Sequence, residues 1–201
     1  LDKPLRSMGA VIAGRKGGEL APLAVTGSRL RGIEFVSPVA SAQLKSALLL
    51  AGLYADGITR VSEPRPSRDH TERLFEYFGI PIERAAHTVA VQGRPGVSWS
   101  GTKELAVPGD LSAAAFFIVG ASILEGSDVT ITNVGINPTR NGALEILGEM
   151  GGDIQLLNPR QQAGEPVADI RVHAHSLRGI RIGAEWIPRT IDEFPILFIA
   201  A

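Results

Sequence analysis

The sequence of 201 residues contains no cysteine, which excludes a disulfide scaffold, a thiolate metal site and a cysteine nucleophile. Histidine is also scarce, and the four present, His70, His87, His173 and His175, are not spaced as a set of metal ligands. No P-loop and no G-x-G-x-x-G fingerprint follows a predicted strand. We therefore expect no metal site and no nucleotide binding through these motifs.

Long hydrophobic runs and an excess of charge of one sign are absent too. The longest apolar stretches, residues 47–53 and 113–121, are shorter than the about 18 residues needed to cross a bilayer, and no export signal is visible. Twenty basic against 21 acidic residues give a net charge of −1, which argues against nucleic-acid binding. We expect a globular cytoplasmic protein. Its 16 arginines could still serve anionic small substrates, because guanidinium groups suit phosphate and carboxylate.

Both ends of the sequence have the pattern of interrupted helices. Leu1, Leu5 and Met8 form one apolar stripe that ends at Gly9, with no cap before it. Residues 195–201 are apolar and lack a closing glycine, asparagine or basic turn. We expect this chain to be a segment of a longer protein, truncated at both ends.

A unit of about seventy residues repeats along the chain. Amphipathic helices are predicted to stop at Gly9, Gly79 and Gly151, which are 70 and 72 residues apart. Strands are predicted after these stops, over residues 10–12, 80–83 and 153–157. The tetrapeptide Leu-Arg-Gly-Ile occurs at residues 30–33 and again at 177–180, which is close to two repeats further on.

A second kind of helix alternates with the first. These helices are predicted to start at Ser41, Asp110 and about Asp192, and each should be enclosed by protein because it is apolar on nearly every side. Strands are predicted after the first two, over residues 58–62 and 128–132. The pattern predicts an α/β fold with sheets outside and buried helices inside. A domain boundary is expected in residues 101–110, which contain glycine and proline.

The starts of the buried helices are candidate anion sites, because a helix N-terminus has four unpaired N–H donors and a favourable dipole. Ser41 fits a cap, with Ala42 and Gln43 in the first turn. Taken alone, Ser41 is better explained by simple capping, because caps are common and anion sites are few. The amide of Gln43, however, must find a partner in an otherwise apolar segment. Arg68 lies at another helix start, where it could reach an anion, pair with Asp69 or remain solvated.

Two acids precede the third buried helix. Asp192 and Glu193 stand before Pro195, a residue tolerated in a first helical turn. Carboxylates beside a dry core are candidates for proton transfer. The alternative is structural, with Asp192 as the cap and Glu193 as a first-turn acid that favours the helix dipole.

Taken together, the motifs resemble the EPSP synthase (3-phosphoshikimate 1-carboxyvinyltransferase) family over essentially the whole chain. They are SAQLKSALLLAGLYADG, SRDHTERLFEYFG, VPGDLSAAAFFIVGASI, NVGINPTRNGALEILGEMGG and IPRTIDEFP. The resemblance implies two lobes of βαβαββ units, an inside-out α/β arrangement, with residues 1–107 in the first lobe and 108–201 in the second. It implies transfer of the enolpyruvyl group of phosphoenolpyruvate to the 5-hydroxyl of shikimate 3-phosphate, with no cofactor or metal.

The resemblance also assigns residues by matching position. Ser41, Ala42, Gln43 and Arg68 are implied to bind shikimate 3-phosphate, and Gln43 also phosphoenolpyruvate. Asp192 is implied to bind the accepting ring and to take its hydroxyl proton. Other family motifs fall outside these residues, so we expect the segment alone to be inactive. We expect a monomer with small-molecule substrates as its partners.

Two alternatives remain. The related enolpyruvyl transferase that acts on UDP-N-acetylglucosamine shares the architecture, but its catalytic loop uses a cysteine. A non-catalytic binding protein of the same fold is the other alternative, against which the acids at 192 and 193 argue.

Overall fold

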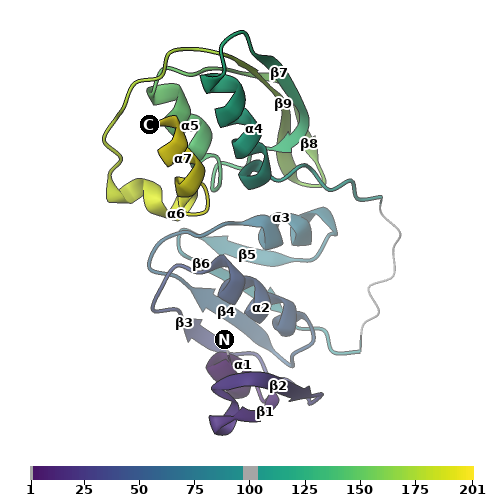
Figure 1. Cartoon of the computed structure of the whole chain (residues 1–201). Helices are drawn as coiled ribbons and strands as arrows, with labels where there is room; N and C mark the ends of the chain where they lie inside the picture. The colour runs from purple at the N-terminus through teal and green to yellow at the C-terminus, as the bar shows by residue number, and fades with distance from the viewer. Residues whose placement is uncertain (1, 97–103) are drawn as a thin grey trace. The chain divides into compact units, whose positions relative to one another are not determined.

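The computed structural model describes residues 2–96 and 104–201, and its contacts divide the chain into two compact units, residues 1–103 and 104–201. Each unit has its own sheet and its own layer of helices (Figure 1). Residues 101–103 of the predicted boundary lie outside the described residues.

The first unit begins with a helix and a hairpin and continues with a βαβαββ unit. The helix and hairpin are α1 (Asp2–Ser7), β1 (Val11–Arg15), the 3-10 turn η1 (Lys16–Gly18) and β2 (Leu20–Thr26). The βαβαββ unit is β3 (Glu34–Val36), α2 (Ala42–Leu53), β4 (Ile58–Ser62), α3 (His70–Tyr77), β5 (Ile82–Ala85) and β6 (Thr88–Gln92). Its sheet has the order β3-β4-β6-β5, with β3 parallel to β4 and the other neighbours antiparallel. Helices α2 and α3 pack on this sheet (Figure 1).

The second unit repeats the order of elements that follows β3 in the first unit and continues with a 3-10 turn and two short helices. They are α4 (Leu111–Ile123), β7 (Asp128–Gly135), α5 (Gly142–Glu149), β8 (Asp153–Gln162), β9 (Glu165–His173), the 3-10 turn η2 (Ala184–Trp186), α6 (Ile187–Thr190) and α7 (Phe194–Ala200). Its antiparallel sheet has the order β7-β9-β8. A single parallel bridge between Gly109 and Val134 stands where the first unit has β3 beside β4. The repeat predicted from the sequence is therefore present in both units.

The three predicted glycine stops share one geometry. Gly9, Gly79 and Gly151 have φ angles of 104°, 71° and 95°, in the left-handed region that glycine adopts without strain. In each case the next residue donates its N–H to the carbonyl five positions back, over 2.8–3.0 Å, which is the Schellman ending of a helix. The periodic stops in the sequence thus correspond to one repeated helix terminus.

The repeated tetrapeptide also has equivalent surroundings. The N–H of Arg31 donates to the carbonyl of Met8, and the N–H of Arg178 donates to the carbonyl of Met150, each over 2.8 Å. Met8 and Met150 are the buried residues before the stops at Gly9 and Gly151. Each copy therefore ties the chain back to the end of an amphipathic helix.

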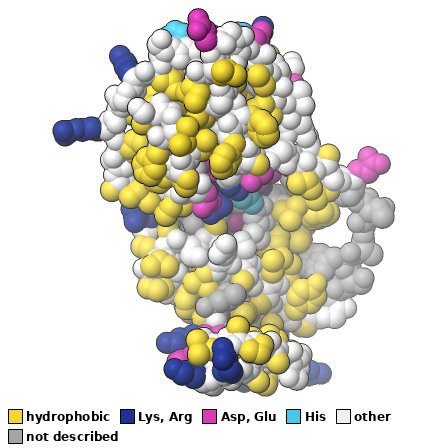
Figure 2. Space-filling view, viewed as in Figure 1, with side chains coloured by type: hydrophobic (Ala, Val, Ile, Leu, Met, Phe, Trp, Pro, Cys, Tyr) yellow, Lys and Arg dark blue, Asp and Glu magenta, His cyan; other side chains and the backbone are white. Residues whose placement is uncertain are grey.

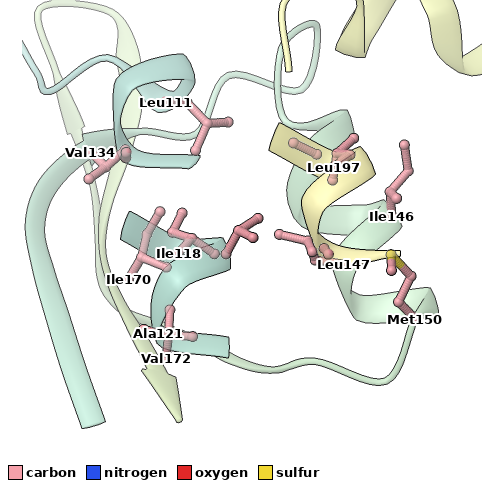
Figure 3. Close-up of a cluster of buried hydrophobic side chains, with 14 residues drawn as sticks. Leu111, Ile118, Ala121, Val134, Ile146, Leu147, Met150, Ile170, Val172 and Leu197 are labelled. Carbon is pink, nitrogen blue, oxygen red and sulfur yellow. The ribbon is translucent and has the colours of Figure 1, made fainter. Parts of the chain in front are cut away.

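Each unit has a hydrophobic core between its sheet and its helices. In the first unit, Leu48 and Leu49 of α2 pack with Phe75 of α3 and with Val61 and Val91 of the sheet. In the second, the core joins residues of α4, α5, β9 and α7 (Figure 3), among them Ile118, Ile146, Leu147, Ile170 and Leu197. These clusters confirm the predicted burial of one face of the amphipathic helices.

Within the described residues, the apolar helices that were predicted to be enclosed by protein are covered on one side only. Phe116 and Phe117 of α4 are 58% and 68% exposed, and Phe198 of α7 is 71% exposed. Figure 2 shows hydrophobic side chains gathered over the helices of the second unit. The reason is geometric, because one three-stranded sheet covers only one side of the helix layer.

Candidate functional site

The start of α2 is a helix N-terminus capped by a side chain. Ser41 is the N-cap, with φ −143° and ψ 100°, and its hydroxyl accepts a hydrogen bond from the N–H of Leu44 over 3.3 Å. This bond leaves the N–H groups of Ala42 and Gln43 at the first turn, where a helix offers no internal acceptor. The side chain of Gln43 is exposed. A 12-residue helix therefore has its positive end and two N–H donors at this turn, which also carries the exposed Gln43.

Arg68 lies on the segment that connects β4 to α3. It stands between β4 and α3, next to Ser67, and its side chain is half-buried. Asp69 accepts hydrogen bonds from Arg73 over 2.8 Å and from Arg84 over 3.0 Å, so it is held by cations of α3 and β5. Asp69 occupies the N-cap position of α3 but makes no capping bond with its side chain.

A buried carboxylate connects these two segments. One oxygen of Glu63 accepts the N–H of Ser41 over 2.9 Å, and the other accepts the hydroxyl of Ser67 over 2.8 Å. The ammonium of Lys45 lies 3.2 Å from Glu63 and 2.7 Å from Glu72. All three ionic side chains are at most 5% exposed. The cap of α2 and the residue beside Arg68 are therefore fixed to one buried group.

Sequence reasoning missed this ionic cluster. The available signal was Lys45, a charged residue inside the apolar stretch SAQLKSALLL, because a buried ammonium requires a carboxylate partner. Nothing in the local pattern identifies Glu63 and Glu72 as its partners, since they lie 18 and 27 residues further along the chain.

The acids before α7 occupy different positions from those expected. Asp192 is exposed, and Glu193, only 3% exposed, occupies the N-cap position of α7. The structural alternative with Asp192 as the cap is therefore wrong. The carboxylate of Glu193 accepts the hydroxyl of Ser112 at the start of α4, and Arg140 lies 3.9 Å from the same carboxylate.

The predicted site residues are thus divided between the two units. Ser41, Ala42, Gln43 and Arg68 are in the first unit, and the structure brings the segments that carry them together through Glu63. Asp192 is in the second unit. Among the described residues, no group of histidines and acids is arranged to hold a metal ion, and no helix of residues 2–96 and 104–201 combines the length and apolar character needed to span a membrane.

Comparison with known proteins decides the family. The family model described as EPSP synthase (3-phosphoshikimate 1-carboxyvinyltransferase) matches residues 1–201. The chain belongs to the EPSP synthase family. It is 56% identical over 199 residues to the 3-phosphoshikimate 1-carboxyvinyltransferase of Geotalea uraniireducens, covering 99% of this chain and 46% of that protein. The identity to the Methylococcus capsulatus protein of the same name is also 56%, over 99% of this chain and 45% of that protein.

Solved structures of the EPSP synthase family have the same fold. The EPSP synthase from Acinetobacter baumannii matches with a TM-score of 0.85 and 48% identity, over 100% of this chain and 45% of that one. The enolpyruvyl transferase NikO from Streptomyces tendae has a TM-score of 0.63 at 17% identity, over 88% of this chain and 42% of that one, and shares the fold. The α/β fold and the family expected from the sequence are confirmed. The chain spans less than half the length of these relatives.

Proposed function

We propose that this chain contributes to the transfer of the enolpyruvyl group of phosphoenolpyruvate to the 5-hydroxyl of shikimate 3-phosphate. The observation that carries the proposal is the joined pair of segments at the start of α2 and before α3, in a chain whose full length matches the EPSP synthase family. The products would be the enolpyruvyl ether and inorganic phosphate. The curated relatives carry the name of this activity.

The first unit would hold the phosphorylated acceptor. Ser41, the N–H groups of Ala42 and Gln43, and the guanidinium of Arg68 offer the donors and positive charge that a phosphate requires. The amide of Gln43, which is exposed, would also reach phosphoenolpyruvate. Two anions can be brought together only where such groups offset their repulsion.

The second unit would supply the proton acceptor. As the 5-hydroxyl oxygen adds to the enol carbon of phosphoenolpyruvate, the hydroxyl loses its proton and the methylene carbon gains one. Loss of a methyl proton and breakage of the bond to phosphate oxygen then restore the double bond and release phosphate. The exposed carboxylate of Asp192 is suited to bind the acceptor and to take the hydroxyl proton. The proposal also assigns residues 1–107 and 108–201 to two lobes that close around the substrates. It further includes a monomeric state, a cytoplasmic location and an activity without a cofactor.

The test is an assay of phosphate release by a protein of the relatives' full length that carries these residues. We expect turnover with phosphoenolpyruvate and shikimate 3-phosphate, and none when UDP-N-acetylglucosamine replaces the latter. Turnover with the UDP-sugar would favour the related enolpyruvyl transferase. Binding without turnover would favour a non-catalytic protein. The 201 residues alone are expected to be inactive, and turnover by them would contradict that expectation.

A further inference from the structure

Glu63 is placed where a single side chain can control the shape of the anion site. Its main-chain N–H donates to the carbonyl of His87 over 2.8 Å, so its backbone is fixed to the sheet immediately after β4. From this fixed point its two carboxylate oxygens reach in different directions, one to the N–H of Ser41 and one to the hydroxyl of Ser67. Each oxygen therefore holds one of the two segments that carry the proposed phosphate ligands.

Lys45 makes a negative charge acceptable at this position. A bare carboxylate beside a phosphate site would repel the ligand and would be costly to bury. Lys45 lies in the first turns of α2, and its N–H donates to the carbonyl of Ser41 over 3.0 Å. The ammonium, 3.2 Å from the carboxylate, offsets the charge of Glu63.

Stability alone does not explain this buried ionic cluster. Buried ion pairs seldom stabilise a fold more than apolar residues of the same size, because both charges lose their hydration. The cluster does hold the two ligand-bearing segments at a fixed distance. This favours ligand binding, since a site that is already ordered loses less conformational entropy when the ligand binds.

We propose that Glu63 is a positioning residue that locks the cap of α2 and the Ser67–Arg68 segment into one preformed cradle for the phosphate of shikimate 3-phosphate, with Lys45 neutralising its charge. This inference rests on the proposed function. Glu63 touches no substrate; it acts through the Ser41 main chain and through Ser67, which holds Arg68 next to it in the chain.

Glu72 offers a matched control. It contacts the same ammonium over 2.7 Å and is as buried as Glu63, but its other oxygen, Oε2, has no hydrogen-bond partner in the described structure and it is bonded to neither Ser41 nor Ser67. Glu63→Gln and Glu72→Gln therefore remove the same charge from the same cluster. Only the first disturbs the two substrate-binding segments.

The experiment uses a protein of the relatives' full length that carries these residues, with steady-state kinetics and calorimetric titration of shikimate 3-phosphate. Glu63→Gln is expected to raise the KM and the Kd for shikimate 3-phosphate by about tenfold or more. A tenfold increase corresponds to the lower end of the free-energy range for losing a hydrogen bond to a charged group. The kcat and the KM for phosphoenolpyruvate should change less. Glu72→Gln should leave the Kd for shikimate 3-phosphate close to that of the unsubstituted protein, whatever its effect on thermal stability.

Ser67→Ala keeps the proposal testable if Glu63→Gln does not fold. It removes one of the two bonds from a half-buried site, so it should also raise the Kd. If both single variants fold, combining them should cost less than the sum of their effects, because they break the same connection. The proposal would be overturned if the Kd for shikimate 3-phosphate were unchanged in both Ser67→Ala and Glu63→Gln. It would also be overturned if Glu63→Gln and Glu72→Gln raised this Kd equally. An unsubstituted protein that does not bind shikimate 3-phosphate would instead overturn the proposed function.

Discussion

The hydroxyl of Ser112, at the start of α4, donates a hydrogen bond to the buried carboxylate of Glu193, the residue that precedes α7. This bond joins segments 81 residues apart in the chain. Asp192 is adjacent to Glu193, so the bond also fixes the main chain from which the proposed proton acceptor projects.

Replacing Ser112 by alanine should therefore destabilise the second unit. Removal of the hydroxyl leaves a carboxylate that is 3% exposed without this donor, and the free energy of unfolding should fall by about 1.5–3 kcal/mol. Denaturant unfolding of a protein carrying these residues measures the change.

Asp110→Asn is the matched control for that substitution. Asn keeps the N-cap of α4 and removes only the ion pair of an exposed carboxylate with Arg140 at 3.3 Å, so about 1 kcal/mol or less should be lost. If Asp110→Asn lowered the free energy of unfolding as much as Ser112→Ala, the buried bond between Ser112 and Glu193 would not be the cause of the destabilisation.

Arg68→Ala should weaken the binding of shikimate 3-phosphate. The variant removes a guanidinium beside the proposed phosphate site, and about 1.5–3 kcal/mol of binding free energy should be lost with a hydrogen bond to a charged group. Titration calorimetry at fixed ionic strength measures this loss. Arg65→Ala removes an exposed guanidinium three residues earlier and should have little effect. Equal Kd values for the two variants would remove Arg68 from the site.

The glycine endings should respond to substitution according to their backbone angle. Gly151 has φ 95°, where an L-residue is strained, so Gly151→Ala should cost about 1–2 kcal/mol of stability. Gly148 lies three residues earlier on the exposed side of α5, and a Cβ there would meet nothing within 4 Å. Gly148→Ala should instead stabilise the protein by about 0.4–1 kcal/mol. Equal shifts in the denaturation midpoint would refute the role of the φ angle.

Asp169 should make the stability of the second unit depend on pH. Its carboxylate accepts a hydrogen bond from the Asn158 side chain and one from the Asn133 N–H, and these bonds, with Arg160 nearby, hold its pKa below the ordinary 3.8. The charged form is thus favoured in the folded state. Its contribution is fully present above pH 3.8 and is lost as the pH falls through the lower folded pKa.

The measurement compares the unsubstituted protein with Asp169→Asn by denaturant unfolding at pH 6 and at pH 2–3. The difference in stability between the two should shrink at the lower pH, because protonation of Asp169 removes the advantage of its charged form. A difference that stays constant would show that the charge of Asp169 is not involved. Asp169 lies on β9 between two β-bulges, at Asn133 and Asn158, so loss of its bonds should also loosen both neighbouring strands.

Local features of the fold could be predicted from the sequence because each is determined by neighbouring residues. The glycine stops, the cap at Ser41, the helix start at Asp110 and the strand Ile58–Ser62 all follow from patterns of a few residues, and the structure confirms them. The family was identified from motifs spread along the whole chain, and the comparisons confirm it.

Other features depended on distant residues and could not be predicted locally. The third apolar helix begins at Phe194, close to the predicted start at about Asp192, but the helix α6 that precedes it was not predicted. The assignment of Glu63 as the link between two ligand-bearing segments required the sheet to bring Ser41 and Ser67 to the same carboxylate. The roles of Ser41, Ala42, Gln43, Arg68 and Asp192 stay predictions.

The glycines of the two Leu-Arg-Gly-Ile copies differ in how well they tolerate substitution. A methyl group on Gly32 would sit 2.2 Å from the carbonyl oxygen of Ile58, so any larger residue would push the chain away from β4. Around Gly179 nothing lies within 4 Å of that position, and a side chain could be added there freely. Although the two tetrapeptides are identical in sequence, Gly32 is therefore indispensable, whereas a protein engineer could replace Gly179.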